Sequence, residues 1–215
     1  MILRHDRPDE DCLVDEEDWP AVVTFFGGDG AATLVAARWL LTAGHTAANI
    51  PPDHLVRVGG RAARVVRVVA HPDGHDLALV ELDPGPEGVA PIALHERPDE
   101  LGAEALLLGR GDFGTGRDGV RGTDGRLRCV TNRIDDVDDR WLRMRFDPPP
   151  DCTPLEGVGG EGDSGGPALV HASGGLAIVG VSSWQDHDGP LGTYGCVEHY
   201  ARVSSQIDWI RAICD

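Results

Sequence analysis

The sequence of 215 residues contains no lysine, so every fixed positive charge belongs to an arginine. Against 19 basic residues stand 36 acidic ones, and the formal net charge is −17. Such an acidic surface repels phosphate backbones, which argues against nucleic-acid binding. Long hydrophobic runs are also absent, because the apolar stretch 105–108 is far shorter than the roughly 20 residues that cross a membrane. We therefore expect neither a nucleic acid nor a membrane as partner.

No apolar secretory segment opens the chain, since its first 19 residues are dense in carboxylates. Five scattered cysteines, an odd number without CxxC spacing, fit neither a zinc site nor a complete disulfide framework. Reduced thiols and a cytoplasmic protein are expected on this basis. A secreted protein whose leader is missing from the sequence is the alternative.

Turn-forming residues are abundant, with 29 glycines and 15 prolines. Between them stand short β-branched or aliphatic runs such as AVVTFF, TLVAA and DLALVEL, a pattern typical of strands. These runs form two series of similar length. They predict an all-β protein organised as an acidic arm, an N-terminal β unit, a C-terminal β unit and a closing helix, with the bounds 1–19, 20–100, 101–203 and 204–215.

The closing segment has the spacing of a short helix. Its isoleucines, Ile207, Ile210 and Ile213, recur at helical intervals. Ser205 stands three residues before Asp208, which predicts a capping box at the start of the helix.

The most informative segment is GDSGGP, which places Ser164 between glycines in a tight turn before an apolar strand. A serine hydroxyl is a weak nucleophile at neutral pH, and it needs a positioned base together with donors for an oxyanion. The segment LTAGH ends an apolar strand with His45, which can supply the base. The segment HDLAL places Asp76 at the head of a buried strand, where a carboxylate can orient an imidazole.

With these segments in the order histidine, aspartate, serine, the sequence resembles the chymotrypsin/trypsin-like serine proteases, as a bacterial-type member. The resemblance spans residues 20–213 and rests on the three segments together with SSW at 182–184 and YARVSSQIDWI at 200–210. It implies an all-β fold of two packed six-stranded antiparallel β-barrels with a short C-terminal helix. It also implies a catalytic triad in the cleft between the barrels and hydrolysis of peptide bonds through an acyl-enzyme, without a cofactor.

Carried over residue by residue, the resemblance assigns a role to each member of the triad. Ser164 would be the nucleophile, His45 the general base and then general acid, and Asp76 the group that orients the imidazole. The backbone N–H groups of Gly162 and Ser164 would form the oxyanion hole.

Asp163 directly precedes the nucleophile, and the resemblance implies that it compensates an α-amine released by cleavage before an Ile-Val-Gly-Gly start. No such start is present in this chain. Two alternatives stay open, namely the α-amine of Ile2 after removal of Met1, or the guanidinium of Arg110 or Arg4. One of them is needed, because a buried lone carboxylate is costly.

The substrate-binding residues follow from the same resemblance. Val158, six residues before Ser164, stands where trypsin-type enzymes have an aspartate at the base of the specificity pocket, and its neighbour Gly159 is predicted to bind substrate as well. Glu198 is either a wall of that pocket, able to hold an Arg or Lys side chain, or an exposed loop acid. A basic preference is predicted, with small apolar side chains as the competitor. The strand that pairs with the substrate backbone comprises Ser183, Trp184 and Gln185, and Gln185 narrows the pocket entrance.

No metal site is expected from the sequence. The segment between His45 and Asp76 lacks the paired glutamates of the family's calcium loop, and His71 and His75 are interpreted as structural or solvated. The predicted function is limited proteolysis of a specific protein partner by a serine endopeptidase. The alternatives are a protease-like binding module without activity and a secreted digestive protease that lacks its leader.

Overall fold

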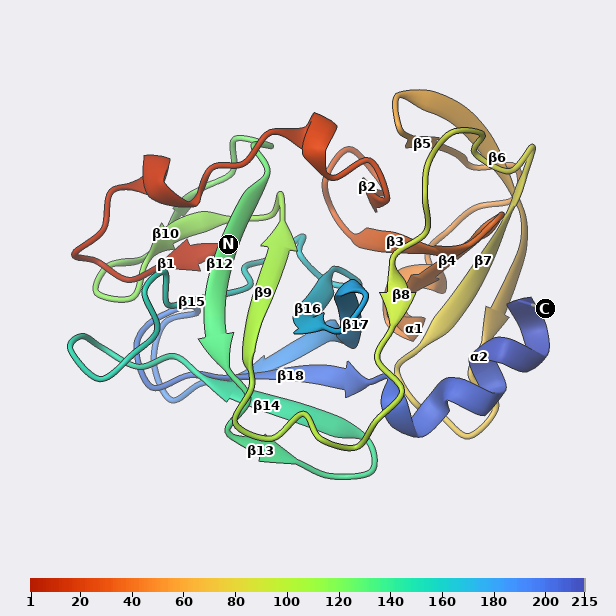
Figure 1. Cartoon of the computed structure of the whole chain (residues 1–215). Helices are drawn as coiled ribbons and strands as arrows, with labels where there is room; N and C mark the ends of the chain where they lie inside the picture. Colours follow the sequence, from red (N-terminus) through yellow and green to blue (C-terminus); the bar gives the residue numbers. More distant parts are fainter. Residues whose placement is uncertain (215) are drawn as a thin grey trace.

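Short strands separated by tight turns form two β units that lie side by side in the computed structural model (Figure 1). The structure describes residues 1–214. The first unit is a six-stranded antiparallel sheet with the order β2-β3-β4-β7-β6-β5. Its strands are β2 (Val22–Thr24), β3 (Ala31–Ala36), β4 (Trp39–Thr42), β5 (Leu55–Val58), β6 (Arg61–Ala70) and β7 (Ala78–Asp83).

An eight-stranded sheet forms the larger part of the second unit, with the path β12-β9-β16-β17-β18-β14-β13 and with β8 paired to β17. Its strands are β8 (Ala93–Leu94), β9 (Glu104–Gly109), β12 (Arg128–Arg133), β13 (Asp136–Val137), β14 (Trp141–Arg145), β16 (Pro167–Ala172), β17 (Gly175–Asp186) and β18 (Val197–Arg202). A four-stranded sheet in the order β11-β10-β1-β15 completes it, with β1 (Ile2–Leu3), β10 (Phe113–Thr115), β11 (Gly119–Gly122) and β15 (Gly157–Val158). The predicted all-β fold class is confirmed, with the strands of the second unit divided between two sheets.

One apolar cluster joins the two units. It contains Leu41 and Leu79 from the first unit together with Leu169 and Val181 from the second, and all four are buried. Because side chains of both sheets share this core, the units hold a fixed position relative to each other. A short helix, α1 (Gly44–Ala47), follows β4.

The closing segment begins with a 3-10 turn, η3 (Ser204–Gln206), and continues as helix α2 (Ile207–Cys214). Its buried residues Ile207 and Ile210 join the shared apolar cluster. The predicted capping box is wrong, because the Ser205 hydroxyl donates to the carbonyl of Asp139 at 2.8 Å and no side chain of the described residues caps the turn. Residue 215, the last of the predicted helix, lies outside the described residues. No helix within residues 1–214 is long and apolar enough to cross a membrane.

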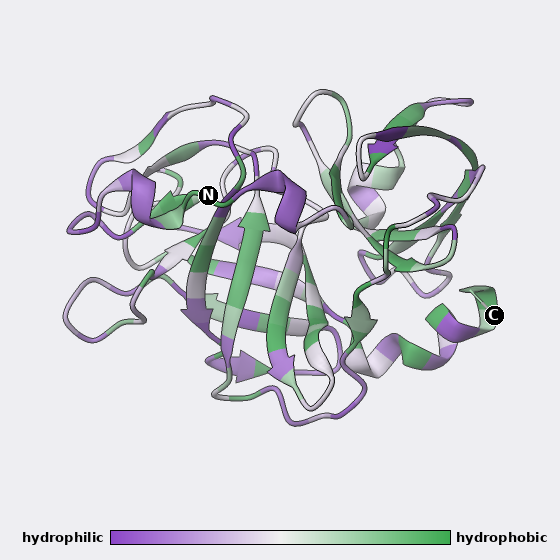
Figure 2. Cartoon of the chain, turned by 45° about the horizontal axis from the view of Figure 1, so that its top comes forward, coloured by the Kyte–Doolittle hydropathy of each residue, from purple (hydrophilic) through white to green (hydrophobic). Residues whose placement is uncertain are grey.

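The acidic arm crosses the second unit and contains two 3-10 turns, η1 (Asp9–Cys12) and η2 (Glu16–Asp18). Its start is buried, since Met1, Ile2 and Leu3 are 1%, 0% and 2% exposed. Strand β1 lies between β10 and β15, parallel to the first and antiparallel to the second. Figure 2 shows this apolar start next to the hydrophilic turns of the arm. The arm is thus anchored at its first residues.

Candidate active site

His45 and Asp76 meet because β4 and β7 are neighbours. Thr42 pairs with Ala78, so residues just past the end of β4 lie near those just before β7. Asp76 Oδ2 is 2.8 Å from His45 Nδ1, and Oδ1 accepts the backbone N–H of His45 at 2.9 Å. The hydroxyl of Ser183 in β17 donates to the same Oδ2. These bonds fix the imidazole ring and place the proton of its neutral form on Nδ1.

The same contacts shift the pKa of both groups. The hydrogen bond to Asp76 raises the pKa of His45 above its ordinary value, because it stabilises the imidazolium. Burial by itself would raise the pKa of Asp76, but the hydrogen bonds from His45 and Ser183 outweigh burial and leave that pKa lowered. Asp76 is therefore a carboxylate at neutral pH.

Two glycines shape the turn that carries Ser164. Gly162 has φ +90°, and a Cβ there would stand 2.6 Å from a backbone carbonyl oxygen of the first unit. Gly165 has φ +86°, and a Cβ there would stand 2.2 Å from the carbonyl oxygen of Ala31. Only glycine fits at these positions. Both units hold the turn, because the Ser164 carbonyl accepts from Ala31 at 2.7 Å and Gly165 donates to Ser182 at 2.8 Å.

His45 and Ser164 line one cavity of about 300 Å³. Among residues 1–214 the Ser164 hydroxyl forms no hydrogen bond, and His45 Nε2 has one long contact, 3.5 Å to Thr46 Oγ1. Hydrogen bonds between a nucleophile and its base are often open until substrate binds, so Nε2 remains available to take a proton. The backbone N–H groups of Gly162 and Ser164 also donate no hydrogen bond within the described chain. Two donors are thus available next to the hydroxyl.

Asp163 is paired with the α-amine of Met1. The amine nitrogen lies 2.8 Å from Oδ2, and the two groups are 1% and 2% exposed. The same amine donates to the carbonyl of Asp112 at 2.6 Å. Asp163 also accepts the backbone N–H groups of Gly160 at 2.8 Å and Gly111 at 2.7 Å. The carboxylate before the nucleophile is therefore fully occupied.

Both predicted partners of Asp163 are wrong. In the structure the α-amine that pairs with Asp163 belongs to Met1 and not to Ile2. The predicted arginines pair with carboxylates of the arm instead, Arg110 with Glu16 and Arg4 with Asp6. The available signal was the apolar triplet MIL at the head of an otherwise acidic arm.

A second, narrower cavity of about 140 Å³ opens beside Ser164. Five of the six predicted substrate-binding residues line it, namely Gly159, Ser183, Trp184, Gln185 and Glu198. Val158 is the exception. It is buried in β15, pairs with Ile2 and packs with Phe146, so its predicted place at the base of the pocket is wrong.

Glu198 of β18 is 2% exposed, which makes the alternative of an exposed loop acid wrong. Its Oε2 accepts the N–H of Gly159 at 2.7 Å and its Oε1 accepts the Ser182 hydroxyl at 3.2 Å. Burial raises the pKa of Glu198 to about 7. On the other side of Gly159, Gln185 Nε2 donates to its carbonyl at 2.7 Å, while the buried Oε1 has no hydrogen-bond partner among residues 1–214. The carboxyl of Glu198, with its pKa of about 7, and the side-chain amide of Gln185 thus line the same cavity.

Trp184 is 46% exposed and forms one wall of the cavity. Its ring stacks on His199, with ring centroids 3.7 Å apart and an interplanar angle of 9°. Trp141 meets both rings edge-on. Sequence reasoning missed His199 as the support of this wall, although it lies on the strand next to Trp184 in register.

Comparison with known proteins identifies the family. The sequence model described as trypsin matches residues 13–210. The chain belongs to the trypsin family. Trypsin 5G1 of Aedes aegypti is 28% identical, over 88% of this chain and 75% of the mosquito protein. Serine protease SP24D of Anopheles gambiae is 28% identical, over 93% and 78%. Neuropsin, a serine protease expressed in the limbic system of mouse brain, shares the fold with a TM-score of 0.74 over 95% of this chain and 98% of its own, at 19% identity.

The predicted relationship to trypsin-like proteases is confirmed by this match. The relatives named come from mosquitoes and mouse, so they give no support to the prediction of a bacterial-type member. Membership in the trypsin family states the class of protein, and the chemistry must be argued from the geometry of the site.

Replacing Asp76 by asparagine tests its pairing with His45. We expect kcat to fall about 10⁴-fold with the fold intact, because the ring loses the carboxylate that fixes its tautomer and stabilises the imidazolium. The base must be neutral to act, and the Asp76 bond raises the pKa of His45, so the acid limb of kcat/KM should move to lower pH in the variant. Initial rates as a function of pH measure both effects. Near-normal turnover would mean that another carboxylate orients the ring.

Proposed function

We propose that the chain is a serine endopeptidase. The observation that carries the proposal is the pairing of His45 with Asp76 beside Ser164 in one cavity, next to two unused backbone donors. A hydroxyl, a base fixed through its other nitrogen and preorganised N–H groups are the parts that acyl transfer requires. Membership in the trypsin family supports the same reaction class.

In the proposed reaction the Ser164 oxygen attacks the peptide carbonyl while His45 Nε2 takes the hydroxyl proton. The N–H groups of Gly162 and Ser164 stabilise the oxyanion, and loss of one such donor typically costs about 10²- to 10³-fold in rate. The imidazolium then gives its proton to the leaving amine, which leaves an acyl-enzyme. Water attacks the ester with His45 again as base, and release of the acid restores Ser164. Asp76 stays ionised throughout.

A binding module without activity is the alternative, and a fluorophosphonate probe separates the two. Only an activated serine attacks the phosphorus and expels fluoride. We expect one label per chain on Ser164 by peptide mass spectrometry, none in Ser164→Ala, and unchanged labelling in Ser173→Ala, which removes a serine from the turn between β16 and β17. A folded wild-type chain that takes no label would favour the binding module.

We further propose that the narrow cavity holds the side chain before the scissile bond and prefers a basic one. Glu198 is the acidic group of its buried wall, and the net charge of −17 steers cations toward the molecule. Because the pKa of Glu198 is raised to about 7, its carboxyl is neutral below that pH and charged above it. A preference for small apolar side chains is the alternative, because the Gln185 side chain, bonded to the carbonyl of Gly159, takes up space at the cavity.

Two peptide substrates that differ only in Arg or Ala before the scissile bond report on Glu198. We expect the Arg/Ala ratio of kcat/KM to rise about tenfold between roughly pH 6 and pH 8, as the carboxyl ionises and attracts the cation. The titration of His45 affects both substrates alike and cancels in the ratio. Glu198→Gln should give a low ratio that does not vary with pH. A wild-type ratio independent of pH would contradict the role of Glu198.

We propose that cleavage is limited to a specific protein partner in the cytoplasm. Two observations support this proposal. The cavity beside Ser164 is only about 140 Å³, and the Gln185 amide in its lining is bonded to the carbonyl of Gly159, so few substrate side chains fit. Free buried thiols at Cys12 and Cys196 suit a reducing compartment.

Digestion of casein tests this restriction. The expected casein rate is far below the rate on a short peptide that carries the preferred side chain, because few casein segments fit the cavity. Casein digestion as fast as that of any defined partner would favour the secreted digestive protease. Gln185→Gly removes this side chain from the cavity and serves as the comparison variant. It should digest casein faster than the wild type.

A further inference from the structure

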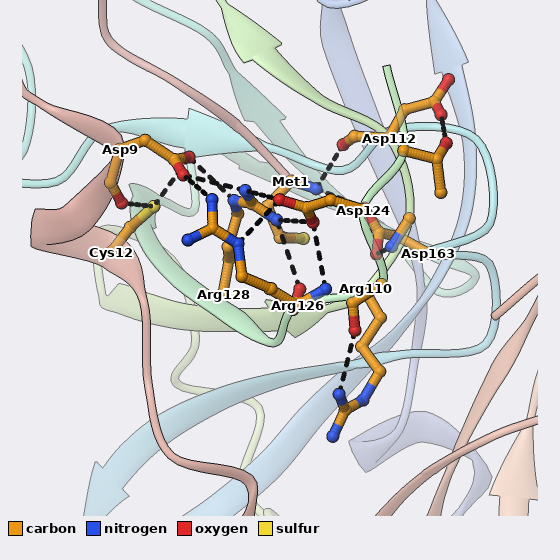
Figure 3. Close-up of polar contacts among 12 residues, drawn as sticks. Met1, Asp9, Cys12, Arg110, Asp112, Asp124, Arg126, Arg128 and Asp163 are labelled. Carbon is orange, nitrogen blue, oxygen red and sulfur yellow. Dashed lines mark hydrogen bonds and ion pairs between the residues drawn. The ribbon is translucent and has the colours of Figure 1, made fainter. Parts of the chain in front are cut away.

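A buried arginine links the acidic arm to the second unit near the Met1 amine (Figure 3). Arg128, the first residue of β12, is 0% exposed. Asp9 bonds its Nε and Nη2 at 2.8 and 2.9 Å, and Asp124 bonds its Nη1 and Nη2 at 2.8 and 2.9 Å. A buried guanidinium is tolerated because each carboxylate binds it with both oxygens. These three residues are the Arg128 cluster.

The two carboxylates of the Arg128 cluster differ in what they connect. Asp124 stands four residues before Arg128, on the loop that leads into β12, so it pairs with the guanidinium within the second unit. Asp9 belongs to η1 of the arm, 119 residues away in sequence. Of the two, Asp9 alone ties the arm down. Asp9 also pairs with Arg126 at 3.0 Å. Loss of Asp9 removes this tie between the arm and the second unit, whereas loss of Asp124 leaves it in place.

The stretch of arm between β1 and the cluster is bonded at its start, where the Arg4 N–H and Nη1 donate to the carbonyls of Glu156 and Thr153, both at 2.8 Å, and the His5 N–H donates to the Tyr194 hydroxyl at 2.9 Å. Residues 6–8 are exposed. After these exposed residues, Asp9 is the next residue of the arm whose side chain is bonded to the second unit. An anchor eight residues from a chain end keeps that end at high effective concentration near its site.

The Arg128 cluster also lies next to the segment whose backbone binds the Met1 amine. The guanidinium carbon of Arg128 stands 4.7 Å from the ring centre of Phe113. Phe113 directly follows the two residues whose backbone groups bond the Met1 amine and its partner Asp163. Arg128 thus contacts both the arm that carries the amine and Phe113, the neighbour of the Asp112 carbonyl that accepts from it.

We propose that Asp9 and Arg128 are positioning residues for the Ser164 turn. They fix the arm so that the Met1 amine stays on Asp163, and Asp163 in turn holds the turn on which Ser164 presents its hydroxyl and N–H group. The consequence for activity rests on the proposed protease function. The burial of the amine does not rest on it and is measured separately.

The absence of lysine makes this measurement selective, because the Met1 α-amine is the one primary amine of the sequence. An acetylating N-hydroxysuccinimide ester therefore reports the exposure of Met1 through intact mass, with the labelled position confirmed in the N-terminal peptide. We expect slow labelling of the wild type. Asp9→Ala and Arg128→Met should label at least about tenfold faster and lose at least about tenfold in kcat/KM, because without the bidentate tie the start of the arm opens locally more often and exposes the amine. Arg128→Lys is avoided, since it would add a second amine.

Asp124→Ala is the matched comparison, because it removes one carboxylate from the same guanidinium without touching the arm. It should label markedly more slowly than Asp9→Ala. Arg202→Met is the control for loss of stability alone: Arg202 bonds buried Glu100 at 3.0 Å through two nitrogens, away from the arm. It should lower the melting temperature and leave the labelling rate of the folded protein unchanged.

The outcomes separate the two proposals. Equal labelling of Asp9→Ala and Asp124→Ala, wild-type labelling of Asp9→Ala, or fast labelling of Arg202→Met would each overturn the positioning role. If Asp9→Ala exposes the amine while the wild type takes no fluorophosphonate, the protease proposal fails and the fixation of the arm stands. If exposure of the amine and loss of kcat/KM rise together across the variants, both proposals are supported.

Discussion

The buried ion pair between the Met1 amine and Asp163 is the interaction on which the candidate site depends. Both charges are removed from water, so each is tolerable only in the presence of the other. Asp163 is the residue next to Ser164, and its two oxygens also hold the backbone at Gly111 and Gly160. A single carboxylate thus couples the start of the chain, the residues just before β10 and the turn that carries Ser164. If the amine leaves, these backbone donors must find another arrangement around an unpaired buried charge.

The candidate site is also the joint between the two units. The Ser183 hydroxyl of the second unit bonds Asp76 of the first, and the serine turn of the second unit accepts backbone N–H groups from Gly30 and Ala31 of the first. The shared apolar cluster holds the two sheets together but does not set their relative orientation, because the hydrophobic effect is non-directional. The hydrogen bonds set that orientation. A shift of one unit against the other would therefore open the same contacts that orient the imidazole and the hydroxyl.

The sequence predicted the parts of the site that are determined locally. The turn around Ser164 needs glycine at 162 and 165 for reasons of φ and space that act within a few residues, and the strand-end positions of His45 and Asp76 follow from short apolar runs. The failures concern contacts that only tertiary structure creates. Counting back from Ser164 reached Val158, but β15 pairs it with Ile2 in the core. The apolar triplet MIL indicates that the start of the arm is buried, but it does not identify Asp163, 162 positions away, as the partner of the amine.

The geometry of Asp163 explains why an amine occupies this site in a chain that is rich in arginine. A guanidinium binds a carboxylate best when both oxygens face its planar fork, as Asp9 and Asp124 do for Arg128. Asp163 cannot present two free oxygens, because Gly111 occupies Oδ1 and Gly160 shares Oδ2. One compact donor with a single short bond suits the remaining lone pair, and an ammonium is such a donor. The sequence has no lysine, and in the structure the ammonium that binds Asp163 is the α-amine of Met1.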